Sequence, residues 1–98
     1  KIYVFTSDTV VGKQIINTTL DKMFKFISLR LTGVKKVSDF IESVSDFLSG
    51  YYVDKQDALI LRNKFEQLNL IESYIGEDDV EMIKLTDFGK KMMNKLNS

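Results

Sequence analysis

The sequence contains no cysteine, no histidine and no proline among its 98 residues. Without cysteine, neither a disulfide framework nor a thiolate metal site can form. Without histidine, the commonest general base and the commonest metal ligand of proteins are both absent. These absences exclude most catalytic mechanisms. The sequence therefore predicts a protein that is not an enzyme and that uses no metal and no cofactor.

Long apolar runs are also absent, and no basic segment is followed by an apolar stretch and a small-residue cleavage site. We therefore expect a cytoplasmic protein without a membrane partner. With 44% hydrophobic residues, a chain of this length builds one core but not two, so residues 1–98 are predicted to form a single domain. Because the first residue is lysine and not methionine, we expect a few residues to precede it.

Basic and acidic residues balance at 14 each, but the two signs are unevenly distributed along the chain. Residues 1–36 carry seven basic and two acidic side chains, and residues 37–53 carry three acidic and no basic ones. Residues 54–98 carry seven basic and nine acidic ones. Any electropositive surface is therefore local and not global.

The chain begins with a segment that favours extended structure. Residues 1–6 alternate aliphatic and aromatic side chains and stop at the turn-forming pair Ser7 and Asp8. This pattern predicts a strand or an extended arm within residues 1–17.

A first helix is predicted over residues 18–32. Thr18 and Asp21 fit a capping box at its start, and Gly33 ends it. Its apolar residues repeat at helical spacing, which indicates one buried face made of Leu20, Met23, Phe24, Ile27 and Leu31.

Two further helices are predicted over 38–49 and 54–69, with Ser38 and Asp54 as their N-caps and a turn over 50–53 between them. Two helices joined by a tight, glycine-containing turn are typical of a helix-turn-helix. Their expected buried faces comprise Phe40, Ile41, Val44, Phe47 and Leu48 in the first, and Ala58, Leu61, Phe65 and Leu68 in the second.

After residue 69 the apolar period changes from 3.6 to 2, which predicts a hairpin over 70–85 with a polar tip at 76–79. Thr86 then caps a last helix over 86–97. Its expected apolar side comprises Phe88, Met92, Met93 and Leu96, and its lysines are Lys90, Lys91 and Lys95.

Residues 65–93 resemble the winged-helix signature of MarR-type and PadR-type regulators. In that signature an apolar residue and Leu-x-Gly-Leu-Ile close the recognition helix, a polar hairpin follows, and Leu-Thr-x-x-Gly opens the last helix. Asn69 replaces the usual glycine and, like glycine, visits the left-handed region. The matching residues are Leu68, Leu70, Ile71, Leu85, Thr86 and Gly89.

The resemblance covers about the last half of the chain. It implies an α+β, mostly helical fold: a winged helix-turn-helix with an N-terminal arm or strand, a recognition helix over 54–69 and a wing over 70–85. Such folds bind DNA, but they also serve as protein-interaction modules.

The outward ridge of the predicted recognition helix comprises Gln56, Leu59 and Asn63, with Lys55 and Arg62 on one flank. Glutamine and asparagine pair with adenine, lysine and arginine reach guanine or phosphate, and leucine contacts a thymine methyl. The alternative is an ordinary solvated helix face.

Lys35, Lys36 and Ser38 precede or begin the second predicted helix, where backbone-phosphate contacts are expected because helix N-termini and nearby lysines attract anions. The alternative is a solvated lysine pair in a loop. Glu77, Asp78 and Asp79 at the wing tip would repel phosphate, and their spacing does not match a calcium loop.

A homodimer is predicted because apolar residues at Ile15, Ile16, Phe26 and Leu29 exceed what so small a domain buries internally. Together these features predict a sequence-specific, dimeric binder of double-stranded DNA. It would act either as a transcriptional regulator or as a centromere-binding protein in plasmid or viral segregation, and it would bind cooperatively through neighbouring dimers. The alternative is a winged helix that binds a partner protein and no DNA.

Overall fold

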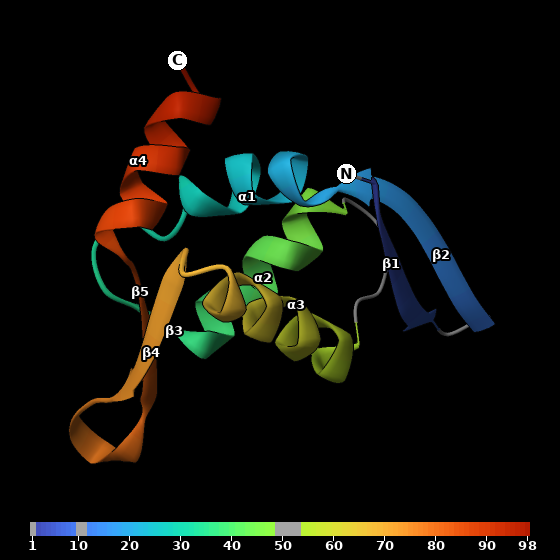
Figure 1. Cartoon of the computed structure of the whole chain (residues 1–98). Coiled ribbons are helices and arrows are strands. Elements are labelled where there is room, and N and C mark those ends of the chain that lie inside the picture. The colour runs from blue at the N-terminus through green and yellow to red at the C-terminus, as the bar shows by residue number, and fades with distance from the viewer. Residues whose placement is uncertain (1, 10–11, 49–53) are drawn as a thin grey trace.

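The computed structural model describes residues 2–9, 12–48 and 54–98, with side chains from Thr18 onward. The elements follow in the order β1 (Ile2–Thr9), β2 (Gly12–Thr19), α1 (Leu20–Ser28), β3 (Lys35–Lys36), α2 (Val37–Phe47), α3 (Lys55–Gln67), β4 (Ile71–Ile75), the 3-10 turn η1 (Glu77–Asp79), β5 (Glu81–Leu85) and α4 (Asp87–Leu96). Figure 1 shows the β1–β2 hairpin on one side of the helices and the β4–β5 wing on the other. The fold is the predicted winged helix-turn-helix.

Across the described residues, no helix combines the length and the apolar character that spanning a bilayer requires. The predicted turn over 50–53 lies outside the described residues.

The N-terminal segment is a two-stranded antiparallel hairpin, in which Ile2 pairs with Thr19 and Thr9 pairs with Gly12. The predicted turn at Ser7 and Asp8 is wrong, because β1 continues through both residues. The second strand was not predicted. Its sequence is rich in β-branched residues, which favour strands when a partner strand lies alongside.

This hairpin moves the start of α1. The predicted capping box of Thr18 with Asp21 is wrong, because Thr18 pairs with Tyr3 in the hairpin. Thr19 is the N-cap instead, and its hydroxyl accepts a hydrogen bond from the backbone N–H of Lys22 at 3.1 Å. The helix also ends at residue 28 and not 32, although Leu31 beyond it remains fully buried.

Of the caps predicted for α2 and α3, one is wrong and one is confirmed. Ser38 is not the N-cap of α2, because Lys36 holds that position and its backbone N–H donates to the Asp39 carboxylate at 2.9 Å. Asp54 caps α3 as predicted and accepts from the backbone N–H of Gln56 at 2.8 Å.

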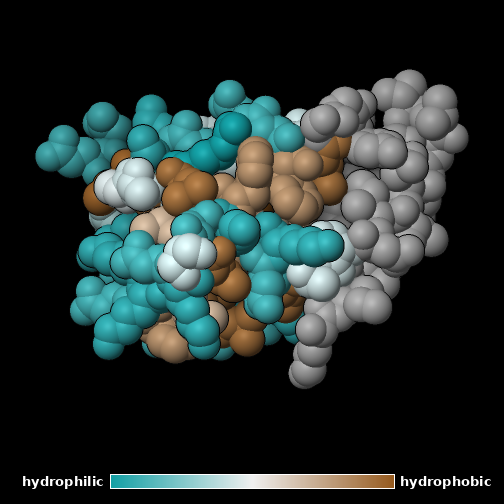
Figure 2. Space-filling model, turned by 90° about the horizontal axis from the view of Figure 1, so that it is seen from above, coloured by the Kyte–Doolittle hydropathy of each residue, from teal (hydrophilic) through white to brown (hydrophobic). Residues whose placement is uncertain are grey.

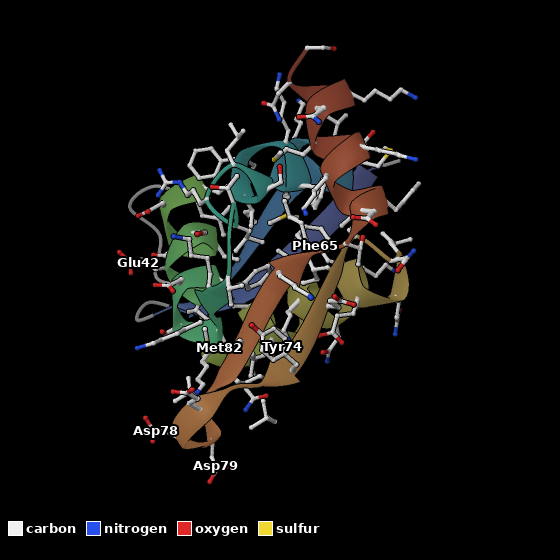
Figure 3. All side chains as sticks on the ribbon, turned by 90° about the vertical axis from the view of Figure 1, so that its left-hand side faces the viewer. Glu42, Phe65, Tyr74, Asp78, Asp79 and Met82 are labelled. Carbon is white, nitrogen blue, oxygen red and sulfur yellow. The ribbon has the colours of Figure 1, made fainter. Side chains whose placement is uncertain are left out.

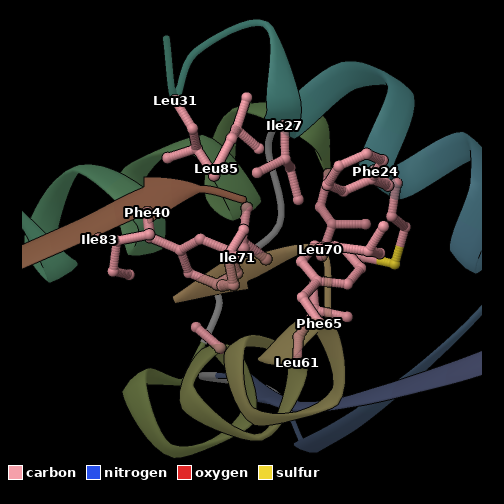
Figure 4. Packing of buried hydrophobic residues seen from close by; sticks show 14 residues of the cluster. Phe24, Ile27, Leu31, Phe40, Leu61, Phe65, Leu70, Ile71, Ile83 and Leu85 are labelled. Carbon is pink, nitrogen blue, oxygen red and sulfur yellow. The ribbon is translucent and has the colours of Figure 1, made fainter. Parts of the chain in front are cut away.

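The core lies where α1, α2, α3 and the wing sheet converge (Figure 4). Phe65 is central, and its ring meets Phe24 edge to face at 5.4 Å and Phe40 at 6.0 Å between centroids. Offset and edge contacts of this kind stabilise aromatic clusters beyond the area they bury. Other fully buried side chains come from three of the four helix faces that the periodicity predicted, namely Met23, Ile27, Leu31, Val44, Ala58 and Leu61.

Two residues predicted to be buried are exposed. Leu68 is 44% exposed, because α3 ends at Gln67 and the chain reverses at Asn69, which has φ 60 and sends Leu70 into the core instead. Phe88 is 47% exposed, whereas its helix packs on the core through Met92, Met93 and Leu96.

The wing belongs to a three-stranded sheet in the order β3-β5-β4. Lys35 pairs with Ile83 and Lys36 with Met82, while β4 and β5 pair from Ile71 with Leu85 onward. The strand β3 was not predicted from the sequence. Two residues are too short for a period to be visible, so only their partner strand reveals them as β3.

The signature at the start of α4 has a physical basis in the structure. The Thr86 hydroxyl accepts from the Gly89 N–H at 2.9 Å and donates to the carbonyl of Asn69 at 2.5 Å. The Thr86 N–H also donates to the carbonyl of Leu70 at 3.1 Å. Threonine at this position therefore caps α4 and ties it to the end of α3.

Candidate nucleic-acid interface

The outward face of α3 is mostly polar. Gln56 and Asn63 are exposed, as predicted, and Lys55 is exposed at the first position of the helix. Because Ala58, Leu61 and Phe65 are fully buried, the opposite side of the helix is free to meet another molecule. Lys64 and Gln67 are also exposed there, although the sequence prediction omitted both.

Two apolar residues lie on this face of α3, the predicted Leu59 and also Ile60, which the prediction omitted. Ile60 is 58% exposed, whereas Leu59 is half-buried. Both lie about equally far around the helix from the buried face, so a complete helical wheel would have included Ile60. The backbone of α3 also lies close to β1.

Arg62 is placed differently from the other predicted contacts. Its guanidinium pairs with both carboxylate oxygens of Glu81 on β5, at 2.6 Å from Oε2, and its side chain is only 15% exposed. Glu66, one turn later, accepts from the hydroxyl of Ser73 on β4. Both bonds join α3 to the wing, so Arg62 positions the wing and presents little surface to a ligand.

The three residues predicted to contact phosphate lie together at the N-terminus of α2. Lys36 and Ser38 are exposed, and Lys35 is half-buried in β3. The Asp39 carboxylate accepts a hydrogen bond from the backbone N–H of Lys36, which is therefore not available to an anion. The lysine side chains thus provide most of the attraction for an anion.

The wing tip is acidic and exposed. Figure 3 shows Asp78 and Asp79 at the end of the hairpin, away from the helices, with Tyr74 and Met82 on the strands behind them. Asp78 and Asp79 have φ of 60 and 58, in the left-handed region that aspartate visits more readily than most residues. Glu77 is also exposed. The tip therefore opposes a phosphate backbone, as the sequence indicated.

The residues predicted to form the dimer interface have different environments. Phe26 is half-buried, with its ring 5.4 Å from that of Phe47 and the Arg30 guanidinium 4.6 Å above it. Leu29 is 54% exposed. Ile15 and Ile16 lie in β2, and their side chains are outside the described part of the structure.

Apolar surface does gather in the middle of the face that α1 and α4 form, as Figure 2 shows. Hydrophilic surface surrounds much of it within the described residues. Leu29 thus stays a candidate for a dimer contact, whereas Phe26 already has partners within its own chain.

Solved structures share this fold, whereas no family model and no curated protein matches the sequence. The chain is similar to the YusO protein of Bacillus subtilis, with 24% identity and a TM-score of 0.57. It is also similar to Sso10a-2, a DNA-binding protein of Sulfolobus solfataricus, with 12% identity and a TM-score of 0.60. A third similar structure is a mutant MarR from E. coli complexed with operator DNA, with 16% identity and a TM-score of 0.58.

Each of these matches covers 82% of this chain. They cover 53% of YusO, 75% of Sso10a-2 and 54% of the MarR mutant, so this chain spans about half the length of two of these proteins. The chain has the winged helix-turn-helix fold, and the resemblance to MarR-type regulators predicted from residues 65–93 is confirmed at the level of that fold.

Proposed function

We propose that this chain binds double-stranded DNA in a sequence-specific manner as a homodimer, with α3 in the major groove and without catalysing a reaction. The observation that carries the proposal is the polar outward face of α3, with Gln56 and Asn63 exposed beside the wing of a winged-helix fold. The similar structure of the MarR mutant holds operator DNA, which supports a DNA partner for this fold.

Each exposed residue of the interface has a distinct role in this proposal. Gln56 and Asn63 pair with base edges, and their side-chain amides suit adenine. Ile60 contacts a thymine methyl. Lys36, Lys55 and Lys64 contact phosphates and position the protein without reading sequence. Arg62 holds the wing against α3, so its contribution is indirect.

The biological role that accompanies this activity is either transcriptional regulation or the binding of a plasmid or viral centromere. Both fit a dimer that binds cooperatively beside its neighbours. The expected cytoplasmic location belongs to the same proposal, since the DNA must be accessible.

The basic surface is small, so single-site affinity is expected to be modest and only weakly dependent on salt. Counterion release gives a slope of log affinity against log salt of roughly −3 to −5 for about four to six phosphate contacts. Fluorescence anisotropy with duplexes selected from a random pool tests the proposal. Enrichment of one sequence that binds more tightly than the pool supports it. Absence of binding to any duplex at about 50 mM salt would refute it.

A second candidate function is association with a partner protein and no DNA. The observations that favour it are the acidic tip at 77–79 and the exposed apolar side chains of the wing, among them Ile75 at 64% exposure. Acidic residues repel phosphate, and exposed apolar residues are typical of protein interfaces. The same anisotropy experiment separates the two functions, because this candidate predicts no duplex binding.

A further inference from the structure

The wing carries an apolar hollow that, apart from Lys36 at its border, the DNA-binding proposal does not use. It is bordered by Lys36 on β3 and by the hairpin, with a lining of Tyr74, Gly76, Glu77, Asp78, Val80 and Met82. Tyr74 and Met82 face each other across the two strands, as the register and Figure 3 agree. Tyr74 and Val80 are exposed, so the hollow is open to another molecule.

The tip side of this hollow is negatively charged, whereas Lys36 places one positive charge at its border on β3. Glu77 and Asp78 line it at the tip, and both are exposed. Within the described part of the chain, neither carboxylate forms an ion pair. An occupant that suits the hollow therefore offers one bulky apolar side chain and positive charge beside it.

One surface of the same chain has this chemistry. Phe88, Lys91 and Lys95 on α4 are spaced at i, i+3 and i+7, so they lie on one face of the helix. Phe88 is 47% exposed and both lysines are exposed. Neither lysine forms an ion pair among the described residues. The helix thus presents an aromatic side chain with two cations along one line.

These two surfaces cannot meet within one molecule. Figures 1 and 3 both show α4 on one side of the folded molecule and the wing tip on the opposite side. A second copy placed in line with the first, however, brings its wing to the α4 of its neighbour. Contacts between two different surfaces of identical chains are head-to-tail, and they add further copies in the same direction.

We propose that the wing hollow of one copy binds the Phe88, Lys91 and Lys95 face of α4 on a second copy. Phe88 fills the apolar hollow, and the lysines face Glu77 and Asp78. This contact goes beyond the proposed DNA binding and requires no DNA. It assigns the acidic tip to a protein contact, which accounts for its unsuitability for phosphate, and it supplies a physical link between neighbouring molecules.

The experiment is sedimentation velocity of the full chain without DNA, over a range of concentrations. A contact made of one apolar side chain and a few exposed charges is small, so its dissociation constant is expected to be on the order of 0.1 to 1 mM. Species larger than the one present at low concentration should appear as concentration rises, and they should diminish when salt is raised to about 1 M, because exposed charges are then screened.

Two variants remove one side of the contact each. Glu77→Gln with Asp78→Asn neutralises the wing rim, and asparagine keeps the left-handed backbone at residue 78. Lys91→Gln with Lys95→Gln neutralises the helix face. Each variant alone should lose the larger species. A mixture of the two should regain association between the two variants, because the intact wing of one binds the intact α4 face of the other, while no contact forms between copies of the same variant.

Matched controls remove the same charges elsewhere. Asp21→Asn with Glu42→Gln on α1 and α2 and, separately, Lys55→Gln with Lys64→Gln on α3 alter exposed residues, and both should associate without DNA as the unaltered chain does. Phe88→Ser tests the apolar part and should also weaken association. The proposal is overturned if the unaltered chain forms no larger species up to about 1 mM. It is equally overturned if either neutralised variant alone keeps the larger species, or if the mixture of the two variants does not associate.

Discussion

At the scale of single residues, α4 approaches the backbone that follows α3 closely at Gly89. A Cβ atom added to Gly89 would lie 1.9 Å from the carbonyl oxygen of Leu70 and 2.9 Å from its carbonyl carbon. No side chain fits in that space, and the obstacle is backbone, which cannot rotate away. The glycine is therefore required by packing and not by its backbone angles.

We expect Gly89→Ala to reduce the free energy of unfolding by at least about 3 kcal/mol, because either α4 or the 69–70 backbone must shift. Gly33→Ala is the control. Gly33 has φ +78 but no atom within 4 Å of an added Cβ, so only backbone strain of about 1 kcal/mol is expected. Urea denaturation followed by circular dichroism measures both. Equal losses in the two variants would contradict the role given to the Leu70 contact.

The ion pair between Arg62 and Glu81 is the second feature that depends on individual side chains. It lies between α3 and β5 with side chains 15% and 34% exposed, whereas the pair of Lys84 with Glu72 across the hairpin is 47% and 54% exposed. Charges that are mostly removed from water depend strongly on their partner, and exposed ones do not.

We expect Glu81→Gln to cost about 1 to 3 kcal/mol of stability, since it leaves a largely buried guanidinium with only the more distant Glu66 carboxylate, 3.9 Å from its Nε. Glu72→Gln should cost less than about 1 kcal/mol. Thermal unfolding of the two variants tests this difference. A loss in Glu72→Gln as large as that in Glu81→Gln would show that burial does not set the strength of these pairs.

At the scale of elements, α3 determines what the proposed interface reads. Its exposed residues include amides, an aliphatic side chain and lysines, and these types act differently on DNA. Base contacts discriminate between sequences, whereas phosphate contacts strengthen all complexes alike.

We expect Gln56→Ala and Asn63→Ala to reduce the preference for the selected sequence over random DNA, by about 1 to 3 kcal/mol per lost base contact. Lys36→Ala and Lys55→Ala should instead weaken binding to both duplexes and lower the salt slope by about one each. Anisotropy titrations on the two duplexes at several salt concentrations measure these effects. Uniform weakening by all four variants would place α3 outside the groove.

Elements also differ in how far local sequence predicts them. The helices and the β4–β5 hairpin have periods that span two turns or several strand residues, so their existence followed from the pattern. β2 and β3 did not, because one reads as a continuation of apolar sequence and the other has two residues. Both are defined by the strand they pair with.

At the scale of the whole molecule, the exposed apolar surface over α1 supports the proposed homodimer. Leu29, at the C-terminal end of α1, is 54% exposed, whereas Phe26 is covered in part by Phe47 and Arg30. A charge at residue 26 would thus disturb internal packing as well as any interface, and a charge at residue 29 would disturb the interface alone.

We expect the unaltered chain to sediment as a dimer of about 23 kDa, twice the 11.3 kDa of the monomer, and Leu29→Asp to shift it to the monomer while its melting temperature at low concentration stays unchanged. Thr32→Asp, another exposed residue nearby, is the control. A monomer at tens of micromolar in the unaltered chain would refute the dimer.

The sequence by itself determined the features that depend on neighbouring residues. Helical periodicity identified the buried faces, Asp54 and Thr86 were recognised as caps, and the resemblance to the winged-helix signature put Asn69 in place of a glycine, at the left-handed position it occupies. These features follow from local sterics and hydrogen bonding within a few residues.

Tertiary structure alone decided which side chains meet across the fold. Arg62 turned toward the wing because Glu81, 19 residues later, lies beside it. Leu68 and Phe88 were left exposed because the reversal at residue 69 and the docking of α4 orient them outward. Long-range pairing of this kind depends on how elements are placed in space, and a periodic pattern within one element carries no information about it.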